Sequence, residues 1–349
     1  MRRDEAHLAA SLTAHQVTSL VHVAIHATQF PDRVRADLRD SLRSRQVNHK
    51  FHYDSVKQTQ KWLALHQIYS PTRNDADCLA VYERSFVAAT TQVTAPAVTV
   101  IGLGCGGGQK DTRLLAQLAA RGRTVAYAPC DVASAMVLVA RQAALAVVPP
   151  AYCHPFVFDL AAAEDLPEVF AASLNPASAR IYTFFGMIPN FPPEIILPRL
   201  AALVRPEDYL LFSANLAPGP DYAAGVRQIL PQYDNTSTHE WLITFLLDLG
   251  VERGDGELRF AIATDPAHGL QRVEARFHFT RTVRVALEED HFEFPAGSDI
   301  RLFFSYRYTP DRVRAALAAH GLQVREQWLT QSGEEGVFLC RRAASSVSA

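Results

Sequence analysis

The fold is decided by residues 98–110, which read Val-Thr-Val-Ile-Gly-Leu-Gly-Cys-Gly-Gly-Gly-Gln-Lys. An apolar, β-branched run breaks here into a glycine-rich loop, and a polar helix start follows. Glycine lets the bare backbone approach a ligand closely, and the amides at the start of the following helix favour polar or anionic groups. Ordering so many glycines costs conformational entropy, which argues against a tight turn without a ligand. The segment therefore predicts a strand, a nucleotide-binding loop and a helix.

The positions of the glycines and of two acids indicate which nucleotide binds. Gly102, Gly104 and Gly107 satisfy the G-x-G-x-x-G pattern of dinucleotide sites. Asp131 ends the next apolar run, where an acid would hold ribose hydroxyls, and Asp159 ends a third run. An acid after the third strand is typical of the adenine contact in methyltransferases. These features favour S-adenosylmethionine (SAM) over NAD and leave a nicotinamide-dependent oxidoreductase as the alternative.

Length and composition restrict the class of protein. With 349 residues, 48% of them apolar and 20% charged, the chain is long enough for one large or two moderate globular domains. The net charge of −2 gives no long-range field for DNA, RNA or an anionic membrane, so we expect neither a nucleic-acid nor a membrane partner. No apolar segment follows the charged start of the chain, which predicts no signal peptide and a cytoplasmic location. Residues 346–349 read as a disordered tail.

Metal and disulfide chemistry have little support in the sequence. The five cysteines are scattered without a C-x-x-C spacing, which argues against a disulfide framework and against a zinc site. His22 and His26 lie four residues apart on an expected helix, which is the spacing of a shared metal ion, but no third ligand lies near them. We therefore expect no metal.

Strand and helix patterns alternate in the middle of the chain, after a first part, residues 5–90, that reads mainly as helices. The predicted strands are 97–103, 124–130, 155–159, 180–185 and 208–214, and the predicted helices are 112–121, 133–147 and 194–204. This alternation is typical of a parallel, doubly wound sheet.

A different pattern follows the turn at residues 218–220. A helical piece at 239–249 precedes strand-like runs at 257–263, 271–286 and 290–294, and the end reads as a helix at 310–320 and strands at 323–330 and 336–341. We interpret the first group as an insertion and the last group as an antiparallel edge of the sheet. Such an edge suits a methyltransferase sheet better than a standard dinucleotide fold.

Five segments match one known family in the same order along the chain. They are 51–54 (Phe-His-Tyr-Asp), 69–73 (Tyr-Ser-Pro-Thr-Arg), 103–110 at the glycine loop, 188–191 (Ile-Pro-Asn-Phe) and 300–308 (Ile-Arg-Leu-Phe-Phe-Ser-Tyr-Arg-Tyr). Through them the chain resembles, over nearly its whole length, the histidine N-alpha-methyltransferases of ergothioneine biosynthesis. These are class I methyltransferases, and their family also includes fungal tryptophan-type N-methyltransferases.

The resemblance implies an α/β fold, in which a Rossmann-like class I methyltransferase sheet carries an added α+β substrate-binding domain. Residues 73–218 and 305–345 would form the methyltransferase core, and residues 1–72 and 219–304 would form the substrate-binding domain. The implied activity is transfer of a methyl group from SAM to a small-molecule amino acid or amine by in-line displacement. We expect a monomer or a weak dimer.

The resemblance also implies a set of site residues. Those for SAM are the glycine loop with its lysine and the two acids at ribose and adenine: Gly104, Gly106, Lys110, Asp131 and Asp159. Those for the amine and carboxylate of the acceptor are Tyr53, Tyr69, Asn190 and Tyr233. Tyr53 and Asn190 are expected to act at the reacting amine. The attacking nitrogen must be neutral, so its proton passes to water or to a tyrosine.

Departures from the family pattern change the expected acceptor. The histidine enzymes hold the imidazole with a Glu and a Ser, where this chain has Phe303 and Ser305, and Ala275 stands where a bulkier residue, typically Met, is usual. Phenylalanine cannot accept the imidazole N–H, and burying that group unpaired costs about 1–3 kcal/mol. The sequence therefore predicts an aromatic amino acid in a pocket with these three residues, and histidine is the alternative acceptor. Because Pro189 replaces a Gly before Asn190, a protein that binds SAM without turnover is a further alternative.

Overall fold

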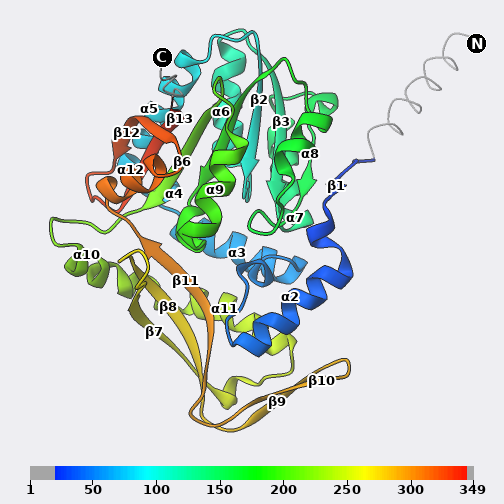
Figure 1. Cartoon of the computed structure of the whole chain (residues 1–349), viewed down its shortest axis with the longest axis vertical. Coiled ribbons are helices and arrows are strands. Elements are labelled where there is room, and N and C mark those ends of the chain that lie inside the picture. Colours follow the sequence, from blue (N-terminus) through cyan, green and yellow to red (C-terminus); the bar gives the residue numbers. More distant parts are fainter. Residues whose placement is uncertain (1–19, 344–349) are drawn as a thin grey trace, which may run out of the picture.

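The computed structural model describes residues 20–343 of the chain. The tail expected at 346–349, and the part of the expected helical region before residue 20, lie outside the described residues. Figure 1 shows a large sheet in the upper half of the view and a smaller group of strands below it.

The large sheet has eight strands in the order β1-β4-β3-β2-β5-β6-β13-β12. The strands are β1 (Ala24–Ile25), β2 (Ala97–Leu103), β3 (Thr124–Asp131), β4 (Phe156–Val157), β5 (Ala179–Phe185), β6 (Tyr209–Asn215), β12 (Leu322–Leu329) and β13 (Glu335–Arg342). Neighbours from β1 to β6 run parallel, and β13 pairs antiparallel with β6 and with β12. The predicted α/β, Rossmann-like methyltransferase sheet is confirmed, including its antiparallel closing strands.

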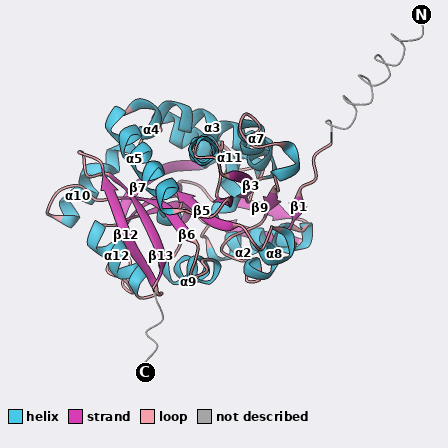
Figure 2. Ribbon diagram, turned by 90° about the horizontal axis from the view of Figure 1, so that it is seen from above, coloured by secondary structure: helices cyan, strands magenta, loops and turns pink. Residues whose placement is uncertain are grey.

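Helices cover both faces of this sheet (Figure 2). The helices are α2 (Pro31–Ser44), α3 (Val56–Tyr69), α4 (Pro71–Asn74), α5 (Ala76–Gln92), α6 (Gln109–Ala120), α7 (Ser134–Ala144), α8 (Leu166–Ser173), α9 (Pro193–Leu203), α10 (Tyr222–Ile229), α11 (Thr236–Asp248) and α12 (Pro310–Ala318). Helices α5, α6 and α7 contribute to the apolar core on one face, and α8, α9 and α12 contribute to the core on the other. The central strands are therefore buried on both sides, which explains their nearly continuous apolar sequences.

The inserted segment forms two small antiparallel sheets. One has the order β11-β8-β7, and the other is a hairpin of β9 and β10. Their strands are β7 (Gly256–Thr264), β8 (Gln271–Phe279), β9 (Val283–Leu287), β10 (Asp290–Phe294) and β11 (Asp299–Arg307). Phe303 of β11 pairs with Ala275 of β8, and a β-bulge lies between Arg301 and Phe303. Helices α2 and α11 close a third apolar core over these strands.

Two local expectations are wrong. The expected helix that would carry His22 and His26 does not form, and two of the residues between them on the chain, Ala24 and Ile25, form the edge strand β1, which pairs in parallel with β4. His26 instead caps a short 3-10 helix, and its Nε2 lies 2.8 Å from Oδ1 of Asp165. The single run expected at 271–286 is divided into β8 and β9. Short apolar runs do not distinguish a helix from a strand until their tertiary partners are known.

Other features of the described residues bear on metal ions, thiols and membranes. Within residues 20–343, no three or more His, Cys, Asp and Glu side chains gather in a way that could hold a metal ion. All five cysteines are free thiols. None of the helices in this part of the chain combines the length and the apolar character that crossing a bilayer requires.

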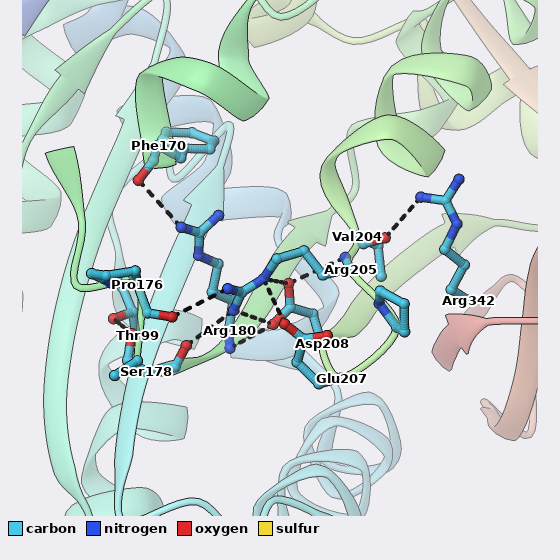
Figure 3. Close-up of polar contacts among 12 residues, drawn as sticks. Thr99, Phe170, Pro176, Ser178, Arg180, Val204, Arg205, Glu207, Asp208 and Arg342 are labelled. Atoms are coloured by element: carbon cyan, nitrogen blue, oxygen red, sulfur yellow. Dashed lines mark hydrogen bonds and ion pairs between the residues drawn. The ribbon is translucent and has the colours of Figure 1, made fainter. Parts of the chain in front are cut away.

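A buried ionic network fixes the amino ends of β5 and β6 (Figure 3). The carboxylate of Asp208 accepts hydrogen bonds from the backbone N–H of Arg180 at 3.0 Å and from Nη2 of Arg205 at 2.8 Å. The guanidinium groups also donate to carbonyl oxygens, Arg180 to Phe170 at 3.2 Å and Arg205 to Ser178 at 3.0 Å. Asp208 is paired with Arg205, and most of the polar groups have partners within the network, so we assign it a structural role.

The buried carboxylate of Asp111 ties α6 to two strands of the sheet. The hydroxyl of Tyr127 on β3 donates to its Oδ2 at 2.6 Å, and Oγ1 of Thr183 on β5 donates to its Oδ1 at 2.7 Å. Burial raises the pKa of Asp111 to about 6, although these two hydrogen bonds lower it in part. The carboxylate fits because Gly102 has no side chain, since a Cβ there would lie 2.2 Å from Oδ2.

We predict that Gly102→Ala lowers the free energy of unfolding by about 1–3 kcal/mol, the usual cost of forcing a methyl group into a filled space. Urea denaturation followed by circular dichroism measures the change. Gly254→Ala is the matched control, because no heavy atom lies within 4 Å of its Cβ position, and it should change stability by less than about 0.5 kcal/mol. A Gly102→Ala protein as stable as the control would mean that Asp111 is not confined as described.

Candidate active site

Two cavities lie at the carboxyl ends of the central strands. Cavity A has a volume of about 380 Å³ and cavity B of about 710 Å³, both in the range of small-molecule sites. The residues that line both are Tyr53, Trp62, Gly104, Gly106, Met187 and Asn190. The strand order reverses between β2 and β5, and the crevice at such a reversal is where open parallel sheets bind ligands.

The glycine loop after β2 contributes to the walls of both cavities. Gly104 and Gly106 have φ angles of 65° and 51°, in the left-handed region that favours glycine. A Cβ on Gly104 would lie 2.8 Å from the side chain of Met187, and one on Gly106 would lie 3.1 Å from the ring of Trp62. The loop therefore keeps its backbone exposed to a ligand because side chains have no room there.

Asp131 ends β3 and lines cavity A. Its Oδ2 accepts a hydrogen bond from the N–H of Gly106 at 3.2 Å, and its Oδ1 accepts one from the N–H of Ala133 at 3.1 Å. Burial raises the pKa of Asp131 to about 6. Each carboxylate oxygen has a further lone pair, so the fixed carboxylate could accept two hydroxyl groups of a ribose.

Asp159 also lines cavity A, and it pairs with a buried lysine. The Nζ of Lys50 lies 3.8 Å from Oδ2 of Asp159 and 2.5 Å from Oδ2 of Asp37. Lys50 is only 4% exposed. Burial raises the pKa of Asp159, and the charge of Lys50 partly offsets that rise. Through Lys50, the segment before α3 therefore contacts Asp159, the residue that the sequence predicts to hold adenine.

Lys110 lines cavity B and not cavity A. Its Nζ donates a hydrogen bond to the hydroxyl of Tyr82 at 2.9 Å, and Tyr82 in turn donates to the carboxylate of Glu335. Burial lowers the pKa of Lys110, and the charge of Glu335 opposes that effect. The lysine expected at the donor is therefore held within a buried polar group at the wall of cavity B.

Tyr53 and Asn190 stand where the two cavities meet. Tyr53 follows a 3-10 helix, η2 (His49–His52), and its ring centroid lies 6.0 Å from that of Trp62. Asn190 ends another 3-10 helix after β5. Burial raises the pKa of Tyr53 further above its ordinary value, so its phenol stays protonated at neutral pH. Tyr53 can therefore orient an amine by hydrogen bonding, but its phenolate is not an available base.

Four further predicted acceptor residues form a closed cluster beside the cavities. The hydroxyl of Tyr233 donates to Oγ of Ser305 at 2.9 Å and accepts from Nη2 of Arg307 at 2.6 Å. The ring of Phe303 lies 5.9 Å from that of Tyr233, and Ala275 is the strand partner of Phe303. None of the four predicted residues lines cavity A or cavity B in the described structure.

The remaining predicted residue, Tyr69, lies apart from this group. It is the last residue of α3, its side chain is 50% exposed, and it lines neither described cavity. The structure thus brings together Tyr53, Asn190 and the expected donor residues, and it separates Tyr69 from them.

The sequence analysis missed several aromatic residues of the cavity walls, and Trp62 and His49 are two of them. Trp62 projects from α3 and lines both cavities, and His49 begins η2 and lines cavity A. The ring of Trp62 stacks on that of His66 with centroids 4.8 Å apart. Neither residue belongs to a motif that marks a site. The only signal is that both lie close to the matching segment at residues 51–54.

Comparisons with known proteins agree with this geometry. The family model described as histidine-specific methyltransferase, SAM-dependent, matches residues 34–342. A histidine N-alpha-methyltransferase of Mycobacterium tuberculosis (strain CDC 1551 / Oshkosh) is 26% identical over 289 residues, which cover 78% of this chain and 83% of the relative. The family match assigns SAM, and not NAD, as the nucleotide.

Solved structures show weaker similarity. The magnesium protoporphyrin IX methyltransferase of Synechocystis PCC 6803 with bound SAH has a TM-score of 0.45 and 12% identity, covering 84% of this chain and 97% of that chain. The CcbJ methyltransferase of Streptomyces caelestis has a TM-score of 0.38 and 14% identity, and the match covers 75% of this chain and 89% of that chain. Because both TM-scores are below 0.5, the fold assignment rests on the strand order given above. Since the family match spans most of its length, the chain belongs to the SAM-dependent, histidine-specific methyltransferase family.

Proposed function

We propose that this SAM-dependent N-methyltransferase methylates the α-amine of an aromatic amino acid or a related aromatic amine. The observation that carries the proposal is the environment of Phe303, which is 6% exposed and packs against other rings. Its centroid lies 5.9 Å from that of Tyr233 and 5.9 Å from that of Trp241. The resembling histidine enzymes have a glutamate at this position, and an apolar ring cannot replace its hydrogen bond to an imidazole.

Binding of the donor is assigned to the glycine loop and the two acids of cavity A. The open backbone at Gly104 and Gly106 and the paired carboxylate of Asp131 support this assignment. Asp159 would hold the adenine end, and Lys110 would act from the wall of cavity B. When bound, SAM supplies an electrophilic methyl group.

Binding of the acceptor amine is assigned to Tyr53 and Asn190, because both side chains reach the two cavities beside the glycine loop. The attacking amine must be neutral. The protonated phenol of Tyr53 would position it, and the proton would leave to water. Holding the nitrogen at about 3 Å and in line with the transferred methyl group would supply much of the rate enhancement.

The proposal also divides the chain into two functional parts. Donor binding is assigned to residues 73–218 and 305–345, and acceptor binding to residues 1–72 and 219–304. The positions of Phe303 and Tyr233 in the inserted segment support this division. The two parts share elements, since β1 belongs to the large sheet and β11 continues across residue 304. The acceptor is a small molecule, and a monomer or weak dimer remains our expectation.

Histidine is the second candidate acceptor, because the family and the mycobacterial relative carry that specificity in their names. Against it stands the cost of an imidazole N–H without a partner, about 1–3 kcal/mol, at Phe303. A third outcome is a protein that binds SAM but transfers no methyl group. Mass spectrometry of the twenty amino acids and common biogenic amines after incubation with SAM distinguishes the three.

We predict that Asp131→Ala weakens the binding of S-adenosylhomocysteine (SAH) at least about tenfold at pH 7.5, because two charge-assisted hydrogen bonds to ribose are lost. Isothermal titration calorimetry measures the affinity. Since the pKa of Asp131 in the free protein is about 6, the carboxylate is protonated at lower pH. The affinity of the wild type for SAH should therefore decrease as the pH is lowered from 7.5 to 5. In Asp131→Ala this pH dependence of SAH affinity should be absent.

The matched control for Asp131→Ala is Asp32→Ala, whose side chain is 99% exposed on α2. It should bind SAH as the wild type does. A folded Asp131→Ala protein with unchanged affinity would falsify the ribose assignment.

We predict that Asn190→Ala raises the KM for the acceptor about tenfold or more and leaves SAH affinity within about threefold. The amide is expected to hold the acceptor amine and not the donor. Steady-state kinetics and calorimetry on the same protein give the two values. Loss of SAH binding with an unchanged acceptor KM would require the two roles to be exchanged.

We predict that Phe303→Glu shifts the kcat/KM ratio of histidine to an aromatic competitor toward histidine by about tenfold or more, since a carboxylate can accept the imidazole N–H. Phe303→Leu, which removes the ring without adding a charge, is the control and should not favour histidine. The aromatic proposal is wrong if the wild type itself prefers histidine. The proposed role of residue 303 is wrong if Phe303→Glu shifts the kcat/KM ratio toward the aromatic competitor.

A further inference from the structure

The imidazole of His49 lies between cavity A and an aromatic cluster formed by Phe303, Tyr233 and Trp241. Its ring centroid is 5.3 Å from that of Phe303 and 4.6 Å from that of Phe304, with the planes close to perpendicular at 69° and 82°. His49 lines cavity A, and Phe303 does not. A ligand in cavity A that approaches the cluster therefore meets the imidazole before it meets the ring of Phe303.

Both ring nitrogens of His49 are buried and have no hydrogen-bond partner within residues 20–343. Buried polar atoms are nearly always paired, and leaving one unpaired costs about 1–3 kcal/mol. His52, one turn later in the same 3-10 helix, has one paired ring nitrogen, because its Nε2 lies 2.6 Å from the carbonyl oxygen of Leu302, and only its Nδ1 is buried without a partner. An unpaired imidazole at the wall of a cavity is the arrangement expected of a group that pairs with a ligand.

The surroundings of His49 keep its imidazole neutral. Burial is the main cause that lowers its pKa well below the ordinary value of 6.5, and the nearby His52 and Arg301 lower it further. A neutral imidazole has one N–H donor and one acceptor nitrogen. It can therefore pair with a single N–H or O–H group, and it offers no charge to an ion.

We propose that His49 determines acceptor specificity by forming a hydrogen bond with the single polar group of an indole or phenol ring. This inference rests on the proposed function and names the class of ring. The acceptor ring would lie in the part of cavity A lined by His49 and Phe304, with its polar edge toward the imidazole. The donor would occupy the part lined by Asp131 and Asp159. A histidine acceptor carries two ring nitrogens, of which His49 could pair only one, so the second would stay buried and unpaired.

The test compares phenylalanine with tyrosine and tryptophan as acceptors, because the three differ in the polar group of the ring. Wild-type protein should prefer tyrosine or tryptophan to phenylalanine. His49→Phe keeps a flat ring of similar size and removes both nitrogens. This substitution should raise the KM for the preferred polar acceptor about tenfold, with kcat nearly unchanged. The KM for phenylalanine should change by less than about threefold.

Controls separate this role from folding and from donor binding. His320→Phe, in the turn after α12, should leave the KM ratios between polar and apolar acceptors unchanged. His49→Gln retains an amide donor and acceptor, so it should keep part of the preference, and His49→Leu replaces His49→Phe if the latter does not fold. Calorimetry should give the same SAH affinity for wild type and His49→Phe. Tenfold weaker SAH binding would overturn the proposal, because His49 would then contact the donor.

The outcomes also separate this inference from the proposed function. If the wild type binds no SAH or methylates no aromatic amine, the proposed function fails. If it methylates aromatic amines and His49→Phe shows the same ratio between polar and apolar rings, only the assignment of His49 is overturned.

Discussion

The hydrogen-bonded carboxylate of Asp111 is the constraint on which the site depends. It joins the first turn of α6 to Tyr127 and Thr183 on the strands that flank β2, and the absence of a side chain at Gly102 makes room for it. These contacts fix the direction in which the chain leaves β2 and therefore the position of the glycine loop. They also tie α6 to β3 and β5, the two strands that lead to Asp131 and to the turn with Asn190. A second network, around Asp208, holds the amino ends of β5 and β6, at the opposite edge of the sheet.

Much of the fold could be predicted because a parallel sheet covered on both faces has strands that read as continuous apolar runs. The runs at 97–103 and 180–185 coincide closely with β2 and β5. The antiparallel pair at the end was also predicted, from two runs separated by a turn. Strand β1 was not predicted, because its two residues are extended only through their pairing with β4. The turn between β8 and β9 carries no glycine or proline, so the pattern at 271–286 gave no break.

The candidate site was predictable where it is local in sequence. Gly104 and Asp131 follow strands directly, and matching segments marked Tyr53 and Asn190, which all line the cavities. Their roles remain predictions. His49 and Lys50 belong to the same short helix as the motif, but their contacts come from elements far away in the chain. No local pattern could indicate that an imidazole stands between residue 303 and cavity A, since that depends on how η2 packs against β11.

The β-bulge in β11 has a consequence for divergence within the family. In a regular strand, residues 301 and 303 would face the same side. The bulge instead places Arg301 beside Phe304, where it contacts Glu274, while Phe303 faces the aromatic cluster. The charged group that contacts the neighbouring strand and the ring that joins the aromatic cluster are thus on opposite faces. If residue 303 sets the acceptor as proposed, it could vary between an acid and an apolar ring without loss of the arginine contact, and a new substrate preference would need few substitutions on an unchanged scaffold.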